Sequence, residues 1–208
     1  MNQKQRKDFF RLLRAKNERP TTELHYTNAY TLLVAVVLSA QATDRGVNKA
    51  TELLFKEVVT PQDMLGLGEE GLRSYIRTIG LYPTKARHII ALSSILCEKH
   101  GGSVPAERSL LEALPGVGRK TANVVLNVYF KRPTIPVDTH VFRVANRTGL
   151  APGGTPLAVE NALLKRVPKA FIADAHHLLI LHGRYVCKAR RPLCELCCVR
   201  DLCAYIKH

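Results

Sequence analysis

The stretch "LEALPGVGRKTANVVLN", residues 111–127, decides how this chain folds. An apolar helical pattern ends at Pro115, and the glycines at 116 and 118 allow a tight turn. A second helical pattern begins near Arg119. Because the first amides of a helix have no intrahelical partner, such a turn binds a phosphate oxygen well. The stretch therefore predicts two helices joined by a phosphate-binding turn, with Lys120 at the start of the second helix.

Two other interpretations of the turn lead to different functions. A nucleotide-binding P-loop needs Gly, four residues and then Gly-Lys-Ser/Thr, but Arg119 precedes the lysine and Leu114 occupies the first glycine position. A plain helix-to-helix turn with a solvated lysine remains open on the turn alone. The 31 Lys and Arg against 17 Asp and Glu, a net charge of +14, favour a nucleic-acid partner. The turn then resembles the helix-hairpin-helix signature, which holds a DNA backbone without reading its sequence.

The rest of the chain predicts an all-α fold. Apolar residues recur at helical spacing, and we find no hairpin signal and no alternating strand. The longest apolar stretch, 29–40, is too short to span a bilayer and predicts a buried core helix. The N-terminus has no secretory signal, so we expect a cytoplasmic protein. The expected helices lie within 7–16, 29–40, 43–59, 69–80, 84–100, 107–114, 120–130, 139–149, 156–167 and 171–183.

The cysteines gather near the C-terminus and indicate a metal site. Five of the six fall between residues 187 and 203, and without a secretory signal this favours metal binding over disulfides. Cys187, Cys194, Cys197 and Cys203 form a C-x6-C-x2-C-x5-C pattern. Four thiolates bind either zinc or a [4Fe–4S] cluster, and the spacing alone does not decide between them. The neighbouring Cys198 leaves open which residue of the pair is the ligand.

Five blocks of the sequence stand in register: "LLVAVVLSAQATD" (32–44), "IRTIGLYPTKA" (76–86), "LPGVGRKTANVVLN" (114–127), "VDTHVFRVANRTGL" (137–150) and "LILHGRYVCKARRPLCELC" (179–197). Together they resemble the endonuclease III family of DNA glycosylase/AP lyases. The resemblance implies two helical domains flanking a DNA-binding groove: 25–131, with the helix-hairpin-helix at about 107–131, and 1–24 together with 132–208, with a cluster loop at 187–203. It also implies base-excision repair, in which damaged, oxidised pyrimidines are removed and the strand is cut on the 3′ side of the abasic site.

The resemblance makes Lys120 the nucleophile that forms a Schiff base and Asp138 its carboxylate partner. Removing a base builds positive charge at the anomeric carbon, and a carboxylate opposite that carbon stabilises it. Asp138 stands just before an apolar helical pattern, an N-cap position whose helix keeps a carboxylate ionised. On the sequence alone, a plain helix cap is a competing interpretation.

The resemblance also assigns the contacts with DNA and the cofactor. A base inside the stack must be flipped out before it is attacked, and the wedge residues that fill the gap map to Gln41 and Leu81. A [4Fe–4S] cluster on the four cysteines, residues 187, 194, 197 and 203, is implied. We expect Asp44, His140 and Arg143 to line the base pocket, and His176, His177 and His182 to be structural. The other predicted DNA-binding residues are Gly116, Gly118, Arg119, Thr121, Lys188, Arg190 and Arg191.

The expected partner is double-stranded DNA with damaged bases or abasic sites, bound by a monomer with no membrane association. Two alternatives remain at this stage. One is a non-catalytic DNA-binding protein with a structural cluster, although binding alone needs neither the lysine nor the aspartate. The other is the adenine or pyrimidine-dimer branch of the same superfamily.

Overall fold

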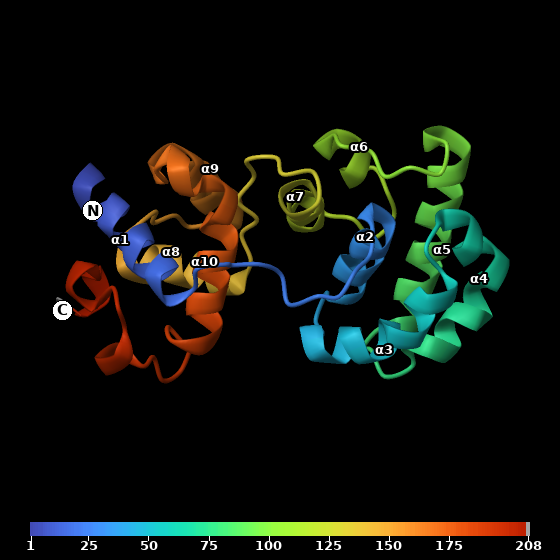
Figure 1. Ribbon diagram of the computed structural model, residues 1–208, viewed down its shortest axis with the longest axis horizontal. Helices are drawn as coiled ribbons and strands as arrows, with labels where there is room; N and C mark the ends of the chain where they lie inside the picture. Colours follow the sequence, from blue (N-terminus) through green and yellow to red (C-terminus); the bar gives the residue numbers. More distant parts are fainter. Residues whose placement is uncertain (207–208) are drawn as a thin grey trace. The chain divides into compact units, whose positions relative to one another are not determined.

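The computed structural model describes residues 1–206 and is all-helical over that range, with no β-strand (Figure 1). The predicted fold class is therefore confirmed. None of the helices in this range is both long and apolar enough to cross a membrane. The α-helices are α1 (Gln3–Lys16), α2 (Ala29–Leu38), α3 (Asp44–Glu57), α4 (Pro61–Ile76), α5 (Tyr82–His100), α6 (Arg108–Glu112), α7 (Arg119–Val128), α8 (Thr139–Thr148), α9 (Pro156–Arg166) and α10 (Ile172–Tyr185), with 3-10 helices η1 (Lys169–Phe171), η2 (Cys194–Leu196), η3 (Arg200–Leu202) and η4 (Ala204–Ile206).

The chain divides into two compact units. The middle unit is Thr22–Lys131, and the terminal unit combines Met1–Thr21 with Arg132–His208. Each has its own buried apolar cluster. The middle unit carries the hairpin of α6 and α7, whereas the terminal unit carries Asp138 and the cysteine-rich segment.

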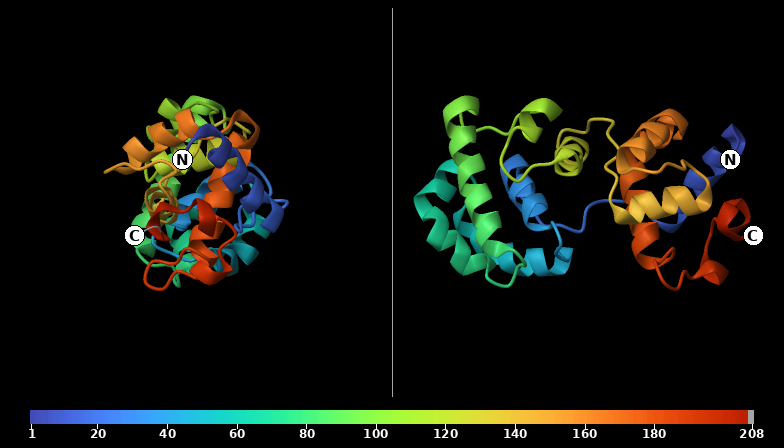
Figure 2. Two further views of the ribbon diagram at one scale, coloured as in Figure 1. Left: turned by 90° about the vertical axis from the view of Figure 1, so that its left-hand side faces the viewer. Right: turned by 180° about the vertical axis from the view of Figure 1, so that it is seen from behind.

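The middle unit is built around α2. Its sequence "AYTLLVAVVL" is apolar on all sides, and every residue from Tyr30 to Leu38 is buried. A helix without a polar face must be enclosed, and α2 contacts α3, α5 and α7. The α4 and α5 helices pack side by side in the same unit (Figure 2). The prediction of a buried core helix at this stretch is confirmed.

Several helix boundaries in the middle unit differ from the sequence-based expectation, among them those of α4 and α6. The α4 helix begins at Pro61, not at 69, because Thr60 caps it, and it continues past a kink at Gly68 before it ends at Ile76. Glycine and a break in apolar spacing hid this first half. The α6 helix ends at Glu112, not at 114, so the turn that follows it is longer than expected.

The terminal unit packs α8 against α10 at very close range. A Cβ atom at Gly183 would lie 2.9 Å from the Cβ of His140 and 3.2 Å from its carbonyl oxygen. Any larger residue at 183 would push the two helices apart. Just before α10, the ring of Phe171 at the end of η1 stacks on the Phe10 ring of α1, with 5.6 Å between centroids. In sequence order, Asp138 directly precedes α8, and the cysteine-rich segment follows α10.

Candidate functional site

The turn between α6 and α7 needs one of its two glycines for the fold. Gly116 has φ +76°, and a Cβ there would lie 3.0 Å from the Cβ of His88 on α5. Both the left-handed backbone and the close approach exclude larger residues. Gly118 has φ −92° and ψ 176°, and a Cβ there would meet nothing within 4 Å. The fold of the described residues therefore gives no reason for glycine at 118.

Lys120 stands at the second position of α7, and it is exposed. No side-chain hydrogen bond caps this helix, because its N-cap residue is Gly118. The starts of α5, α6 and α10 also lack one. The remaining helices are capped by side chains at Asn2, Asn28, Thr43, Thr60, Asp138 and Thr155. Uncapped amides at a helix start favour an anion, so this end of α7 suits a phosphate.

Asp138 is the N-cap of α8, as the sequence predicted. Its Oδ1 accepts a hydrogen bond from the backbone N–H of Val141 at 2.8 Å. Within residues 1–206 no hydrogen bond to the other oxygen, Oδ2, is observed, and the residue is half-buried. One carboxylate oxygen thus fixes the side chain at the helix start, and the other remains available for a ligand.

Gln41 and Leu81 share an unusual backbone conformation. Their φ angles are 57° and 59°, in a region where the only other residue that is not glycine is Lys131 among those described. Leu81 is also 60% exposed. A left-handed backbone costs about 1–3 kcal/mol at residues other than glycine. Such strained conformations cluster at functional sites. Because the exposed side chain of Leu81 adds nothing to the core, the strained backbone of this residue indicates a functional role for the turn at Leu81.

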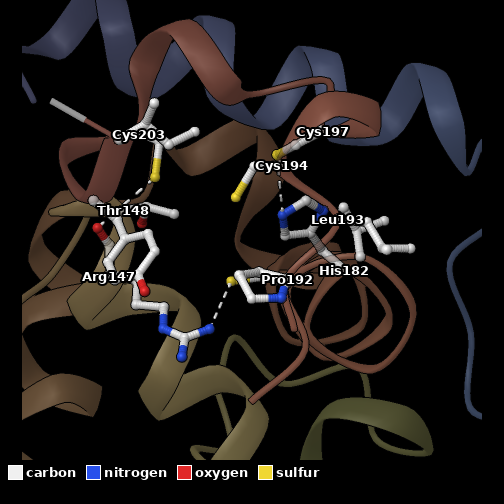
Figure 3. Close-up of a pocket in the computed structure, with 12 residues that line it drawn as sticks. Arg147, Thr148, His182, Pro192, Leu193, Cys194, Cys197 and Cys203 are labelled. Carbon is white, nitrogen blue, oxygen red and sulfur yellow. Dashed lines mark hydrogen bonds between the residues drawn. The ribbon is translucent and has the colours of Figure 1, made fainter. Parts of the chain in front are cut away.

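Four cysteines line one pocket in the terminal unit: Cys187, Cys194, Cys197 and Cys203. Figure 3 shows the sulfur atoms of Cys194, Cys197 and Cys203 around this space. Cys198 lines a different pocket, together with Leu13 and Lys16. The adjacent residues Cys197 and Cys198 thus line different pockets, and only Cys197 shares its pocket with the other three cysteines. This favours Cys197 over Cys198 as the ligand. None of the six cysteines, all of them within the described residues, forms a disulfide.

Of these four cysteines, Cys203 is buried and the other three are partly buried. Burial raises the pKa of Cys197 to about 11, and burial also raises the pKa of Cys203. The Nε2 atom of His182 lies 3.7 Å from the sulfur of Cys197, and burial lowers the pKa of this histidine to about 4. Across residues 1–206, no three His, Cys, Asp or Glu side chains converge as a site for one metal ion.

Two arginines of α8 fix the cysteine-rich segment, and sequence reasoning missed the second of them. Arg143 donates to the carbonyl oxygens of Gly183 at 2.8 Å and Cys187 at 3.0 Å. Arg147 donates to the carbonyl oxygens of Lys188 and Ala189, both at 2.7 Å, and lies over the Tyr205 ring at 5.0 Å. Its guanidinium also lies 3.8 Å from the Cys187 sulfur. No spacing rule marks these contacts, since they join positions about 40 residues apart.

The basic residues of the cysteine-rich segment are exposed. Lys188, Arg190 and Arg191 have no carboxylate partner among the described residues. Arg200 differs, because it pairs with Glu195 at 2.6 Å. Three uncompensated cations on one loop form a surface suited to a polyanion.

The predicted roles of Asp44, His140 and Arg143 in a base pocket stay predictions.

Comparisons with known proteins match this arrangement. The family model "HhH-GPD superfamily base excision DNA repair protein" matches residues 34–169. The chain is 58% identical over 205 residues to endonuclease III of Haemophilus influenzae, covering 99% of this chain and 97% of the relative. It is 57% identical over 205 residues to endonuclease III of Escherichia coli, with the same shares covered.

Solved structures agree with the sequence comparison. A trapped endonuclease III–DNA covalent intermediate superposes with a TM-score of 0.93 at 44% identity, covering 100% of this chain and 98% of that one. A thermostable thymine-DNA glycosylase superposes with a TM-score of 0.87 at 26% identity, covering 98% and 97% of the two chains.

Proposed function

The chain belongs to the HhH-GPD superfamily of base excision DNA repair proteins and is a DNA glycosylase of the endonuclease III type, and from this premise we propose its detailed activity. It removes oxidised pyrimidines from double-stranded DNA and then cuts the strand on the 3′ side of the abasic site. The observation that carries the proposal is the exposed Lys120 at the uncapped start of α7. A solvent-accessible amine at an anion-binding helix start can reach a sugar whose phosphate is held there.

Lys120 is the proposed nucleophile. Its Nζ lone pair forms a bond to C1′ of the sugar, and the bond from C1′ to the base breaks, so the base leaves with that electron pair and is protonated. The sugar ring then opens and leaves an imine between Nζ and C1′. The imine acidifies C2′, and loss of a C2′ proton expels the 3′ phosphate oxygen. The strand is cut with no metal-bound water involved.

Asp138 is the proposed stabiliser of the positive charge that develops at C1′ as the base departs. Two features support this role. The bond from Val141 N–H to Oδ1 holds the side chain in one orientation, and a helix start is a favourable place for a negatively charged side chain. Oδ2 has no partner among the described residues and remains available to the sugar.

The proposed DNA contacts divide into phosphate and gap contacts. The turn residues Gly116, Gly118, Arg119 and Thr121 bind the backbone, and the open space beside Gly118 supports close approach by a phosphate. Lys188, Arg190 and Arg191 add charge contacts on the cysteine-rich segment. Gln41 and Leu81 fill the gap that a flipped nucleotide leaves, a role that their strained and exposed positions support.

The proposed cofactor is a [4Fe–4S] cluster held by Cys187, Cys194, Cys197 and Cys203. In such a cluster each thiolate binds a different iron, and the proposal is supported by the four cysteines lining one pocket. Four thiolates also suit one zinc ion, and the choice of the cluster rests on the endonuclease III family to which the chain belongs. When bound, the cluster links the segment covalently and fixes its basic loop.

Three expectations from the sequence remain part of the proposal: a monomer, action in the cytoplasm, and a domain division at 25–131. The similarity to bacterial proteins supports the proposed action in the cytoplasm. The two compact units have separate apolar cores, which supports the third.

The test of the nucleophile is borohydride trapping on a duplex with a single thymine glycol. The wild-type protein should give a covalent adduct, and Lys120→Gln should lose the adduct and strand cleavage by at least about 1,000-fold, because no other amine replaces it. Lys99→Gln, at an exposed lysine near the end of α5, is the control and should trap normally. An undiminished adduct with Lys120→Gln would disprove the assignment.

The test of the cofactor compares two neighbouring substitutions. Cys197→Ser should lose iron and sulfide, which should otherwise be present at about four of each per chain. Cys198→Ser should keep both, because Cys198 lines another pocket. Stoichiometric zinc in the wild-type protein, or the reverse outcome for the two variants, would contradict the assignment.

A further inference from the structure

Lys85 is a buried cation that the proposed chemistry does not use. It lies in the second turn of α5 and is 6% exposed. Its Nζ donates to the carbonyl oxygen of Leu38 at 2.9 Å and to that of Ala40 at 2.5 Å. Burial lowers its pKa. Lysine is almost never enclosed unless its ammonium group is paired, so this residue has a specific task.

The two carbonyl groups belong to the C-terminal end of α2. That helix has no basic residue in its own last turn, although its last carbonyls carry partial negative charge. The carbonyls of Val37 and Ser39 accept turn hydrogen bonds from the N–H groups of Ala40 and Ala42. The alternate carbonyls, at 38 and 40, are those that accept from Lys85. The ammonium group thus completes the turn that ends α2.

This turn leads directly into Gln41, which has the left-handed backbone conformation described above. Lys85 is also joined to the second strained turn, because its N–H donates to the carbonyl oxygen of Leu81 at 3.0 Å. That backbone bond would form with any residue at 85. The side-chain bonds to Leu38 and Ala40 are specific to lysine, and they connect the segment before Gln41 to the helix that begins at Leu81.

We propose that Lys85 is a positioning residue for base flipping: its ammonium group holds the turn at Gln41 in place relative to the turn at Leu81. This inference rests on the proposed role of Gln41 and Leu81 in filling the gap. Each is exposed and strained, so neither is fixed by burial of its own side chain. The hydrogen bonds from the buried Lys85 to Leu38 and Ala40 fix the segment that leads into Gln41. With its Nζ held by two carbonyls, Lys85 is not a second nucleophile.

The test replaces Lys85 with methionine, which keeps an unbranched apolar side chain of four heavy atoms and removes the donor at its end. Two duplexes serve as substrates, one with a single thymine glycol paired with adenine and one with a pre-formed abasic site at the same position. We expect base release from the paired lesion to fall about 10- to 100-fold, because a misplacement near 1 Å has effects of that size. Cleavage at the abasic site should fall less than about 3-fold, since no base remains to be flipped.

Thr51→Val is the matched control. Thr51 is also buried in the middle unit, and its hydroxyl donates to the carbonyl oxygen of Val47 within α3. The control removes a buried hydrogen bond to a carbonyl without touching either turn. It should leave the ratio of the two activities unchanged. If Lys85→Met reduces both activities equally, or if Thr51→Val changes the ratio as much, the proposal is wrong.

A double-mutant cycle separates this inference from the function on which it rests. In a background of Gln41→Ala with Leu81→Ala, Lys85→Met should reduce release from the paired lesion by less than about 3-fold further, because residues that act through one another are not additive. If the double-alanine protein releases paired lesions normally, the proposed gap-filling role fails. If it is slow but Lys85→Met is normal, only the role of Lys85 fails.

Lys85→Gln is the second variant, in case methionine prevents folding. It keeps two N–H donors on a shorter, neutral side chain. We expect an intermediate loss on the paired lesion and near-normal cleavage of the abasic site. Failure of both variants to fold would overturn the proposal, because Lys85 would then be required for the fold and not for positioning.

Discussion

The starts of α7 and α8 differ in how their first backbone N–H groups are bound: a side chain caps α8, and none caps α7. Both helices begin with free amides and a nearby residue proposed for catalysis. At α8, the cap is Asp138 itself, whose Oδ1 accepts from Val141 N–H. At α7, the cap position is Gly118, which offers no side chain, and Lys120 follows two residues later. One helix start is closed by its functional residue, and the other is left open beside it.

The difference shows how one kind of local structure serves two kinds of chemistry. A carboxylate gains from a helix start, because the dipole and an amide hold it ionised and in one orientation. A lysine gains nothing from that dipole, so its position at α7 is explained by the anion that the open amides attract. Exchanging or removing these features separately should produce different losses.

After Lys120→Gln, the largest expected effect comes from Asp138→Asn, which keeps a capping oxygen and removes the charge. Base removal should fall about 100- to 1,000-fold, as loss of one electrostatic stabiliser of a transition state typically causes. Cleavage of a pre-formed abasic site should fall much less, because no base departs. Single-turnover kinetics on both substrates measure the two steps.

The control for this change is Thr155→Ala at the start of α9. Thr155 caps that helix through the N–H of Ala158, so its loss should lower the free energy of unfolding by about 1 kcal/mol while both activities stay normal. Equal losses on the two substrates with Asp138→Asn would show that the residue is only a cap.

Gly116→Ala tests the turn that precedes α7. Alanine must adopt φ +76° and place its methyl group against His88, so the free energy of unfolding should fall by about 1–3 kcal/mol. Gly118→Ala should change it by less than about 1 kcal/mol, because open space surrounds that position. Thermal denaturation compares the two. A tolerated alanine at 116 would contradict the strained turn.

Gly118→Ser would close the open helix start. The backbone at 118 is already extended, so the serine hydroxyl can accept an amide of the first turn and stabilise the protein by a few tenths of a kcal/mol. Affinity for undamaged duplex should fall about 10-fold, because the hydroxyl competes with a phosphate for the same amide. Gly118→Ala is the control for added bulk. Unchanged affinity with serine would mean that these amides do not bind DNA.

The sequence predicts most of the fold because its helices carry regular apolar spacing. The buried α2 and the cap at Asp138 both follow from local rules that operate within a few residues. The first half of α4 did not follow, because Gly66 and Gly68 weaken the helical pattern where tertiary packing still supports a helix. Local propensity is a weak guide where packing overrides it.

Only part of the candidate site can be predicted from the sequence. The four cysteines and Lys120 stand out by spacing and by resemblance to a family. The left-handed backbone at Leu81 does not, because nothing in a leucine indicates a positive φ. The contacts of Lys85 with Leu38 and of Arg147 with Lys188 also escape sequence reasoning. They join segments that only the folded chain brings together, and they depend on carbonyl groups that every residue has.

The smallest expected effect concerns the basic segment, which binds charge without any helix start. Lys188, Arg190 and Arg191 are exposed and have no carboxylate partner among the described residues. Each change to alanine should lower the slope of log affinity against log salt by about 0.9, if each neutralises one phosphate, and should weaken binding only a few-fold at moderate salt. Arg200→Ala is the control, because Glu195 already pairs with that arginine at 2.6 Å, so its slope should change less. If the three substitutions lower affinity without changing the slope, these residues do not act as phosphate contacts, and the open start of α7 would have to carry the phosphate binding without them.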